Sequence, residues 1–501
     1  MSSATSDSVR RDALRVIMGA FEGEAIPEWL PALVDDGLGG ICLYGNNLGD
    51  SSESVLDLAR RVGALSDGLV LTLDEEGGDV TRLHYGHGSP YPGNAVLGRH
   101  DDVETTAQVA RGIGEELKSG GIWLDLAPDA DVNSNPRNPV IGTRSFGADP
   151  ALVARHTAAW VTGLQAAGVA ACVKHFPGHG DTEADSHLAL PRVDADAATL
   201  RERELVPFTA AARAGAAAVM TSHIVLPALD AENPATMSRA VLTGLLRDEL
   251  AYEGLIVTDA LDMAGASATI GVPAAAVRAL AAGADLLCIG PNLRGRGVED
   301  IVDVVDAIVA AVDDGSLARD RLRDAAARVD ALAATYGTGA RAADADVVAA
   351  GLAAGEVAAA AVQDALGPLP QGTPRVLQVR AHANLAVGEA AWGDLGLEGV
   401  VPRVVDADTL PAADELAAGD GPLVVVTRGA TNVALVWDWL RAVTERRPDA
   451  VVVETAWPSP DLHALPRVLR TWGSSVTATR AAGHVIAEAL AGAVDTTGAH
   501  R

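Results

Sequence analysis

The sequence predicts an α/β protein in which a (β/α)₈ TIM-type barrel is followed by a smaller C-terminal α/β domain. Three observations support this prediction. Short apolar segments alternate with helical patterns from Arg15 to about Val329, polar residues gather at the ends of those segments, and the alternation resumes after a Gly- and Pro-rich linker. A doubly wound open sheet remains the alternative from the pattern alone.

The predicted strands are short, apolar and bounded by glycine or polar residues, as expected of parallel strands buried on both faces. They span Arg15–Phe21, Gly39–Tyr44, Leu69–Asp74, Ile122–Ala127, Val169–Lys174, Ala216–Ser222, Leu255–Asp259 and Ala284–Gly290. Helical patterns lie between them at Ser51–Leu65, Val103–Lys118, Ala151–Ala166, Leu200–Ala214 and Arg239–Ala251. Eight such units in about 300 residues fit a barrel, whose functional sites lie at the C-terminal strand ends.

The pattern changes after Val329. An Ala-rich helical stretch from about Ala340 to Gln363 leads into the linker Gly367–Pro374. A second alternating region follows, with strands expected at Val376–Arg380, Val400–Val405, Leu423–Thr427 and Ala450–Thr455 and helices at Asn432–Thr444 and Thr479–Ala491. We therefore divide the chain into a barrel domain (1–340), a helix with its linker (341–374) and a C-terminal α/β domain (375–501). In that last domain the best functional candidates are Glu454 and Trp457, although a Trp at the edge of a core is the commoner explanation.

Composition and charge argue against several classes of function. The 501 residues carry a net charge of −29 and no basic stripe, which argues against a nucleic-acid partner or an anionic membrane surface. The cysteines stand singly in apolar segments, as is typical of buried thiols in a reducing compartment. Residues 1–12 are polar and lack the apolar core of a signal peptide, and no run of about 18 apolar residues predicts a membrane span. We expect a cytoplasmic protein.

Polar side chains follow five successive predicted strands. Any single one is explained by a helix N-cap, but five in succession indicate a site. They include Asp74 and Arg82 after the third strand, Asp129, Asp131 and Arg144 after the fourth, Lys174 and His175 at the fifth, His223 at the sixth and Asp259 at the seventh.

The densest of these stretches is 173–187, which reads Val-Lys-His-Phe-Pro-Gly-His-Gly-Asp-Thr-Glu-Ala-Asp-Ser-His. So much glycine and charge predicts a loop on a strand end. Asp185 and His187 are two residues apart, so on an extended chain they point to one side. A carboxylate beside an imidazole fixes its tautomer and raises its basicity, which suits proton transfer. A His-rich surface loop, or a metal site built from His175, His179, His187 and nearby Asp residues, is the alternative.

At these residues the chain resembles family 3 glycoside hydrolases, specifically their bacterial β-N-acetylglucosaminidase branch. The resemblance is carried, in the family's order, by Asp74–Gly78 with Arg82, Arg144–Gly147, Lys174–His187 and Ile256–Met263. It implies a (β/α)₈ barrel, with an α/β sandwich as the second domain of longer members. It also implies a retaining, exo-acting hydrolase without a metal or other cofactor. The implied substrate carries a terminal β-linked N-acetylglucosamine, from cell-wall fragments in peptidoglycan recycling or from chitooligosaccharides.

Carried over residue by residue, the resemblance makes Asp259 the nucleophile and His187 the acid/base, oriented by Asp185. It implies sugar-hydroxyl contacts from Asp74, Arg82, Arg144, Lys174 and His175. Glu75 replaces a commoner Gln and Asp79 a commoner basic residue. Both departures lie beside a binding residue, so they put fine specificity in doubt rather than the reaction.

The residue types suit this chemistry. Retaining hydrolysis needs a carboxylate on one face of the anomeric carbon and a proton donor on the other. Asp259 ends a short apolar strand, whereas the rival nucleophile Asp262 falls past the strand end. An imidazole has an ordinary pKa near 6.5, and a neighbouring carboxylate raises it, so His187 can protonate a leaving oxygen near neutral pH. Asp and Arg side chains complement vicinal hydroxyls, or form a buried ion pair with each other.

Other functions stay open. A metal-dependent hydrolase could use the histidines and strand-end carboxylates. A non-catalytic carbohydrate-binding protein would keep the barrel without the chemistry, and the joint presence of Asp259, Asp185 and His187 argues against it. A β-N-acetylglucosaminide phosphorylase is a third alternative, in which phosphate replaces water as the acceptor. A histidine acid/base is compatible with it, because a neutral histidine repels an incoming dianion less than a carboxylate does. A β-glucosidase of the same family would differ only in the sugar.

Overall fold

The computed structural model describes residues 3–49, 51–182, 190–290, 298–380, 386–388 and 390–492. Its first eight strands form one parallel sheet in the order β7-β6-β5-β4-β3-β2-β1-β8. A parallel bridge between Val257 and Leu286 joins the two ends, so the sheet closes on itself. The predicted barrel is confirmed, and the open doubly wound sheet is wrong. The strands are β1 (Ile17–Gly19), β2 (Gly40–Cys42), β3 (Val70–Leu73), β4 (Leu124–Asp125), β5 (Ala170–Phe176), β6 (Ala218–Thr221), β7 (Leu255–Val257) and β8 (Leu287–Cys288).

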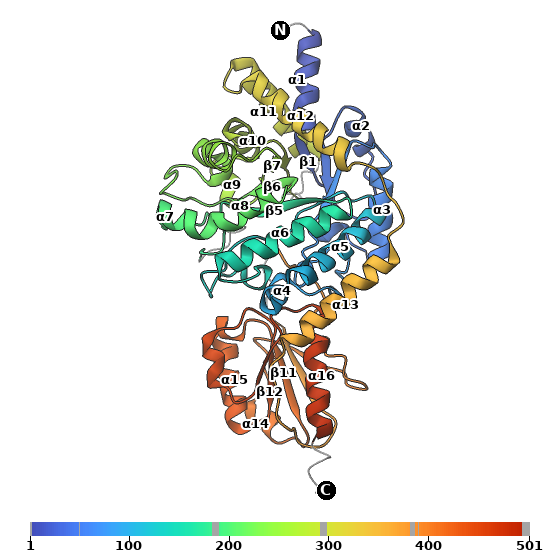
Figure 1. The fold of residues 1–501 in the computed structure, drawn as a ribbon, viewed down its shortest axis with the longest axis vertical. Coiled ribbons are helices and arrows are strands. Elements are labelled where there is room, and N and C mark those ends of the chain that lie inside the picture. Colours follow the sequence, from blue (N-terminus) through green and yellow to red (C-terminus); the bar gives the residue numbers. More distant parts are fainter. Residues whose placement is uncertain are drawn as a thin grey trace.

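Helices surround the barrel (Figure 1). Helix α6 shows why they form where they do. Asp149 caps it by accepting hydrogen bonds from the N–H groups of Ala151 and Leu152, Pro150 occupies its first turn, and Trp160 lies on its buried face. The set comprises α1 (Ser3–Arg15), α2 (Leu30–Asp35), α3 (Ser52–Gly63), α4 (Asn94–His100), α5 (Val103–Ser119), α6 (Pro150–Ala166), α7 (Ala197–Thr199), α8 (Leu205–Arg213), α9 (Ala264–Ser267), α10 (Val272–Ala282), α11 (Val298–Asp314) and α12 (Arg319–Tyr336).

Two helical predictions need correction. The stretch predicted as one helix from Leu200 begins as a π-helical turn over Leu200–Glu204 before α8 continues it. The stretch predicted from Arg239 is π-helical over Ala240–Glu249. Hydrophobic spacing does not distinguish the two helix types, because both bury one face against the barrel.

Apolar side chains pack against both faces of the barrel sheet, inside the barrel and beneath the surrounding helices. Met18, Val70, Leu124, Met220 and Val257 belong to the cluster inside the barrel. All three cysteines are free and buried in the same cluster, as predicted, so they pack as small hydrophobes. A larger cluster lies between the strands and the surrounding helices.

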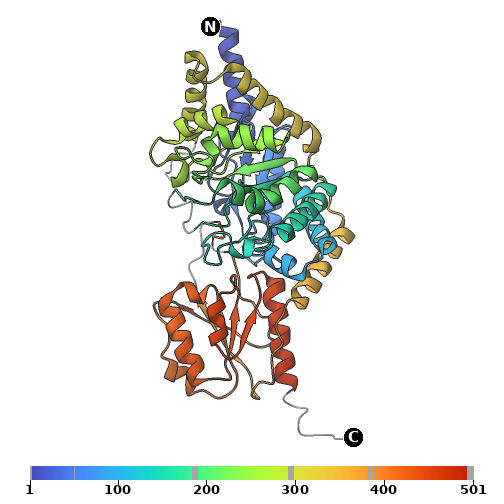
Figure 2. The ribbon, with the colours of Figure 1, turned by 60° about the vertical axis from the view of Figure 1, so that its left-hand side comes forward.

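The C-terminal domain holds five parallel strands in the order β10-β9-β11-β12-β13. Helices α14 and α15 cover one face and α16 the other (Figures 1 and 2). Alternate residues of β11 explain this layering, because Val425 packs with Leu440 of α15 whereas Val424 packs with Ile486 of α16. The elements are β9 (Arg375–Arg380), β10 (Arg403–Asp406), α14 (Ala413–Ala417), β11 (Leu423–Thr427), α15 (Ala434–Arg446), β12 (Val451–Glu454), β13 (Val468–Arg470) and α16 (Val476–Gly492).

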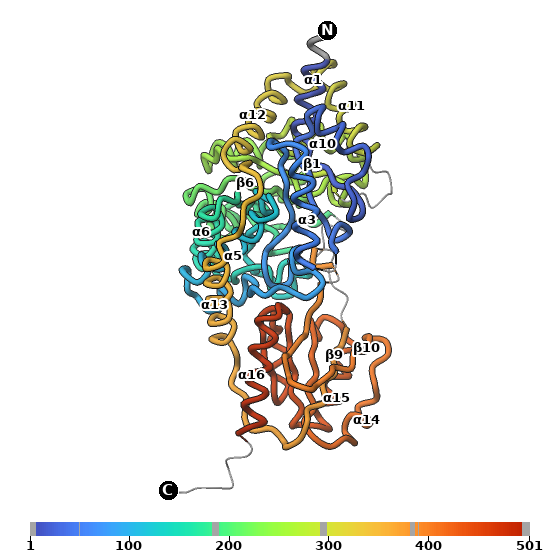
Figure 3. Tube along the Cα trace, turned by 90° about the vertical axis from the view of Figure 1, so that its right-hand side faces the viewer, coloured from blue at the N-terminus to red at the C-terminus, as the bar shows by residue number. Residues whose placement is uncertain are grey.

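Helix α13 (Ala345–Ala361) connects the two sheets. It lies along α5 and reaches α16 (Figure 3). A Cβ at Gly351 would lie 2.9 Å from the carbonyl oxygen of Gln108, so glycine permits the close approach of α13 to α5. The described helices include none with the length and apolar character needed to cross a membrane.

Candidate active site

A pocket of about 950 Å³ lies at the C-terminal ends of the barrel strands. Every strand from β2 to β8 contributes a side chain to its lining, close to the C-terminal end of the strand. These residues are Tyr44, Asp74, Leu126, Lys174, Met220, Asp259 and Cys288. The pocket therefore lies where a barrel of this kind carries its functional groups.

Glu76 holds two of the predicted sugar-binding cations in place. Its carboxylate accepts hydrogen bonds from Nε and Nη2 of Arg144 at 2.9 and 2.7 Å, and Nζ of Lys174 lies 2.7 Å from Oε1. Burial alone would raise the pKa of Glu76, but the two cations outweigh it and hold that pKa well below its usual range. Glu76 stays ionised, so it fixes the positions of Arg144 and Lys174. Sequence reasoning missed this role, although Glu76 lies inside the segment that carries the resemblance.

Asp74 and Arg82 lie at the other side of Lys174. Nζ of Lys174 donates to Oδ1 of Asp74 at 2.6 Å, and Nη2 of Arg82 lies 3.8 Å from Oδ2. Nη2 of Arg82 also donates to the carbonyl oxygen of Ala386, at 2.7 Å. These residues are ion-paired and also line the pocket, so their ion pairs do not exclude the predicted contacts with a sugar. Ala386 follows β9 in sequence, so the C-terminal part of the chain reaches the pocket.

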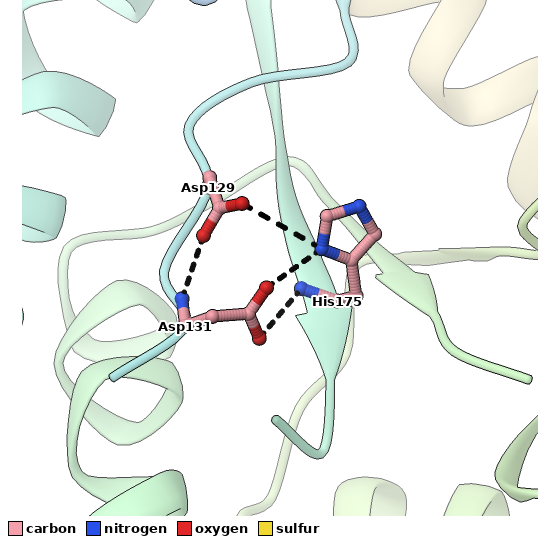
Figure 4. Close-up of side chains that lie close together, drawn as sticks. All are labelled: Asp129, Asp131 and His175. Carbon is pink, nitrogen blue, oxygen red and sulfur yellow. Dashed lines mark hydrogen bonds and ion pairs between the residues drawn. The ribbon is translucent and has the colours of Figure 1, made fainter. Parts of the chain in front are cut away.

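His175 is held by two buried carboxylates (Figure 4). Its Nδ1 lies 2.7 Å from Oδ2 of Asp131 and 3.8 Å from Oδ2 of Asp129. Nη2 of Arg144 lies 3.4 Å from the other ring nitrogen, Nε2, of His175. Because an arginine can only donate, Nε2 accepts there, and the proton of a neutral ring is on Nδ1. Asp131 thus sets the tautomer of His175.

The two aspartates differ in charge. Burial and the neighbouring Asp131 raise the pKa of Asp129 well above its usual range, which favours a protonated carboxyl. Burial acts the same way on Asp131, but His175 outweighs it and lowers the pKa of Asp131. One negative charge therefore faces His175, as expected when like carboxylates share a site.

Asp129, Asp131 and His175 also form the kind of group that can hold a metal ion, with donor atoms within 4.8 Å of one another. A divalent cation there would lie near the guanidinium of Arg144, whose Nη2 is 3.7 Å from Oδ2 of Asp129. Nδ1 of His179 lies 2.8 Å from Oγ1 of Thr182. His187, the third histidine of the predicted metal site, lies outside the described residues.

Two carboxylates after β7 were candidates for the nucleophile. Asp259 is half-buried and lines the pocket, and its Oδ1 accepts from the N–H of Ala260 at 2.8 Å. Asp262 also lines the pocket, but its Oδ1 accepts from the N–H of Gly290 at 3.0 Å, and burial raises its pKa. Both carboxylates therefore lie at the pocket, and Asp259 remains the predicted nucleophile because it stands nearer the end of β7.

The loop after β5 leaves the barrel close to the β4 segment. A Cβ at Gly180 would lie 1.8 Å from the carbonyl oxygen of Val132, so only glycine fits. Nδ2 of Asn138 donates to the carbonyl oxygen of His179 at 2.9 Å. The predicted acid/base residues, Asp185 and His187, lie outside the described residues.

The two departures from the family pattern do not line this pocket. Oε2 of Glu75 accepts from the backbone N–H groups of Arg82 and Leu83, so Glu75 shapes the turn that carries Arg82. Asp79 binds the C-terminal domain instead: its Oδ1 accepts from the N–H and the hydroxyl of Ser474 at 2.6 and 2.7 Å.

Glu454 and Trp457, the two functional candidates of the C-terminal domain, lie in different surroundings. Glu454 is buried and accepts hydrogen bonds from the N–H groups of Gly429, Ala430 and Ala456, so it holds two turns together rather than facing the pocket. Trp457 lines a second cavity, between the two domains.

The chain was compared with known proteins. A family model described as the glycosyl hydrolase family 3 N-terminal domain matches residues 16–332. β-Hexosaminidase A of Pseudoalteromonas piscicida is 36% identical over 314 residues, which are 58% of this chain and 52% of that protein, so the match spans about half of that relative. A β-hexosaminidase of Neisseria meningitidis serogroup C is 37% identical over 278 residues, covering 54% of this chain and 76% of the relative. The solved structure of a glycoside hydrolase family 3 β-N-acetylglucosaminidase from Paenibacillus sp. FPU-7 matches with a TM-score of 0.85 and 31% identity, over 96% of each chain.

Proposed function

The chain belongs to glycosyl hydrolase family 3, and from that premise we propose that it is a retaining, exo-acting β-N-acetylglucosaminidase. One observation carries the proposal. Asp259 shares a single pocket with all five predicted sugar-binding residues, which are Asp74, Arg82, Arg144, Lys174 and His175. A pocket, unlike an open groove, accommodates the end of a glycan rather than its middle.

The proposed reaction has two displacements. In the first, the carboxylate of Asp259 attacks the anomeric carbon while the bond to the leaving oxygen breaks, and His187 protonates that oxygen. In the second, a water molecule attacks the same carbon, its proton passes to His187, and the bond to Asp259 breaks. Asp185 orients His187 throughout. Asp74 and the cations held by Glu76 bind the sugar hydroxyls, so the anomeric carbon stays within reach of Asp259.

The identity of the sugar rests on the relatives. Two of them are β-hexosaminidases, and the Paenibacillus structure is that of a β-N-acetylglucosaminidase. We extend this to a terminal β-linked N-acetylglucosamine on cell-wall fragments or chitooligosaccharides.

The charge balance of the pocket supports water, rather than phosphate, as the acceptor. In the described part of its lining, the cations of Arg82, Arg144 and Lys174 face the carboxylates of Asp74 and Glu76 at 3.8 Å or less. Asp259 adds a further carboxylate. An incoming phosphate dianion would therefore meet no surplus positive charge in this part of the pocket.

The test compares an aryl β-N-acetylglucosaminide with the matching aryl β-glucoside, with and without phosphate and EDTA, using the whole chain. We expect faster turnover of the N-acetylglucosaminide, release of the free sugar with retained β configuration, and resistance to EDTA. Asp259→Asn, checked for folding, should lose turnover on both substrates. Preference for the glucoside would overturn the assigned sugar, a sugar 1-phosphate product would indicate a phosphorylase, and loss of activity in EDTA would indicate a metal-dependent enzyme.

A further inference from the structure

The turn at residues 81–84, which we call the Arg82 turn, is held by Glu75. Glu75 is fully buried and does not line the pocket. Its Oε2 accepts three hydrogen bonds, from the hydroxyl of Thr81 at 2.9 Å and from the N–H groups of Arg82 and Leu83 at 2.8 and 2.9 Å. One carboxylate oxygen therefore fixes three successive residues of the turn.

His84 attaches the same turn to two helices that surround the barrel. Its N–H donates to Oγ1 of Thr81 at 3.1 Å, which closes the turn. Its ring lies between α3 and α5, with Nδ1 3.0 Å from Oγ of Ser52 and Nε2 3.1 Å from Oε2 of Glu116. The side chain of His84 is 15% exposed. The Arg82 turn is therefore held by residues that do not line the pocket themselves.

Two carboxylates act on the charge of His84. Burial alone would lower the pKa of His84, but Glu116 and Glu75 outweigh it and raise that pKa. Burial raises the pKa of Glu75, and the charge of His84 is the largest influence that opposes it. Asp125 accepts a hydrogen bond from the N–H of Glu75 at 3.0 Å, and burial raises the pKa of Asp125 well above its usual range. The charge of His84 therefore supports the ionised form of Glu75, which is the stronger hydrogen-bond acceptor.

Arg82 depends on its turn for its position more than Arg144 does. Two hydrogen bonds to Glu76 fix the guanidinium of Arg144. The guanidinium of Arg82 donates to the carbonyl oxygen of Ala386 at 2.7 Å, and its Nη2 lies 3.8 Å from Oδ2 of Asp74. Its buried Nε has no hydrogen-bond partner among the described residues. A displacement of the turn would therefore move this guanidinium relative to a bound sugar.

We propose that His84 and Glu75 are positioning residues for Arg82, and that the turn they hold sets how tightly the pocket binds the sugar. Both act through the turn, because neither side chain lines the pocket. This role rests on the proposed function, since it takes Arg82 to bind a sugar hydroxyl.

The first test measures the Kd of N-acetylglucosamine for the whole chain by calorimetry at pH 6. We expect His84→Gln, checked for folding, to raise Kd about tenfold, which corresponds to the loss of roughly one hydrogen bond to the sugar. His87→Gln is the matched control, because His87 is exposed and lies three residues further along the chain, and it should leave Kd unchanged. An unchanged Kd in His84→Gln would overturn the proposal. A wild type that does not bind the sugar would instead refute the proposed function.

A second measurement separates positioning from a general loss of stability. His84→Gln and Glu75→Ala should each lower kcat/KM on an aryl β-N-acetylglucosaminide about tenfold, but have little further effect once Arg82→Ala has removed the contact itself. Glu454→Ala is the control, because Glu454 is also buried and accepts backbone N–H groups, but in the C-terminal domain. Any effect of Glu454→Ala should be the same in both backgrounds. Losses from His84→Gln that are as large with Arg82→Ala as without it would show that His84 only stabilises the fold.

The charge of His84 predicts a pH dependence that a purely structural role would not produce. Its pKa lies above the ordinary 6.5, so sugar binding should be tight below that pKa and weaken above it, as the ring loses the charge that supports ionised Glu75. Glu75→Gln keeps an accepting oxygen without the charge, so it should bind the sugar like the wild type at pH 6 and weaken less by pH 9. The ratio of the two Kd values isolates this effect, because other groups of the pocket titrate in both proteins. A ratio that stays constant from pH 6 to pH 9 would overturn the link between His84 and Glu75.

Discussion

At the scale of single residues, the buried carboxylates of the barrel differ in charge because their partners differ. Glu76 remains ionised because Arg144 and Lys174 both contact it. The negative charge of Glu204, near the loop that follows β5, is less well compensated. Its Oε1 accepts a hydrogen bond from Nε of Arg203 at 2.6 Å, but its buried Oε2 has no hydrogen-bond partner among the described residues. Burial raises the pKa of Glu204 to about 7.

This carboxyl should make stability depend on pH. Its folded pKa lies above the ordinary value of 4.5, so the full stability is present below pH 4.5 and declines as pH rises to about 7. The decline amounts to roughly 3 kcal/mol. Glu204→Gln keeps the shape without the charge. Between pH 5 and pH 8, the unfolding free energy of the wild type should therefore fall by up to that amount relative to the variant, as measured by urea denaturation.

Glu202 provides the control for this experiment. It lies on the same π-helical turn but is exposed, so Glu202→Gln should follow the wild-type pH dependence. Parallel pH curves for the wild type and Glu204→Gln would show that the Glu204 carboxyl is ionised in the folded protein at pH 5, contrary to this account.

The pocket residues show how far residue types alone can predict a site. Asp74, Arg82, Lys174 and Asp259 could be named from the sequence because polar groups near the ends of apolar strands must lie at one rim of a barrel, and the family resemblance implied the role of each. Glu76 could not be assigned its role in this way, because its function is a contact with Arg144, 68 residues further along the chain. Pairings across the rim depend on three-dimensional placement, which strand patterns do not encode.

At the scale of elements, the buried strands were the most predictable feature. All eight barrel strands fall on predicted segments, and β5 extends to Phe176, two residues beyond its predicted end. Short apolar runs bounded by glycine specify such strands locally. Strand β13 was missed because only Leu469 of its three residues is buried, so it shows no apolar run.

The loop after β5 combines a fixed beginning with the predicted acid/base residues. Asn138 and the close approach at Gly180 hold the described part, up to Thr182. If His187 is the acid/base, His187→Ala should lose about 10²–10⁴-fold on a substrate with a poor leaving group, the usual contribution of general acid–base catalysis. A dinitrophenyl N-acetylglucosaminide needs no proton, so its first step should survive and the glycosyl-enzyme should accumulate as a burst.

Azide and two further variants complete this prediction. Azide needs no general base, so it should restore turnover of His187→Ala and yield a β-glycosyl azide. Asp185→Asn should show a milder defect, because the imidazole remains. Asp259→Asn should not be rescued. Equal losses on good and poor leaving groups, with no burst and no azide product, would assign His187 to binding or structure and leave the acid to be found elsewhere.

At the scale of the whole molecule, buried apolar contacts and hydrogen bonds join the barrel to the C-terminal domain. The sequence predicted both domains because each has its own apolar strands. The C-terminal sheet has two apolar clusters of its own, and Ala478 of α16 packs into the large cluster of the barrel. The sequence did not predict how the two domains meet. The hydrogen bond from the N–H of Ser474 to Asp79 joins residues 395 positions apart, and Asp79 had been noted only as a departure beside a binding residue.

Asp79 and Arg428 should therefore act as one energetic unit across the domain junction. Their side chains are 5% and 10% exposed, and breaking a buried ion pair from one side leaves a charge without compensation. Asp79→Asn and Arg428→Gln should each cost about 3 kcal/mol of unfolding free energy, as is typical for such pairs. The double variant should lose less than the sum of the two, by at least about 1 kcal/mol, because the second change removes the charge left by the first. Strictly additive losses in urea denaturation would mean that Asp79 stabilises the junction through its hydrogen bonds with Ser474 and Thr143 alone.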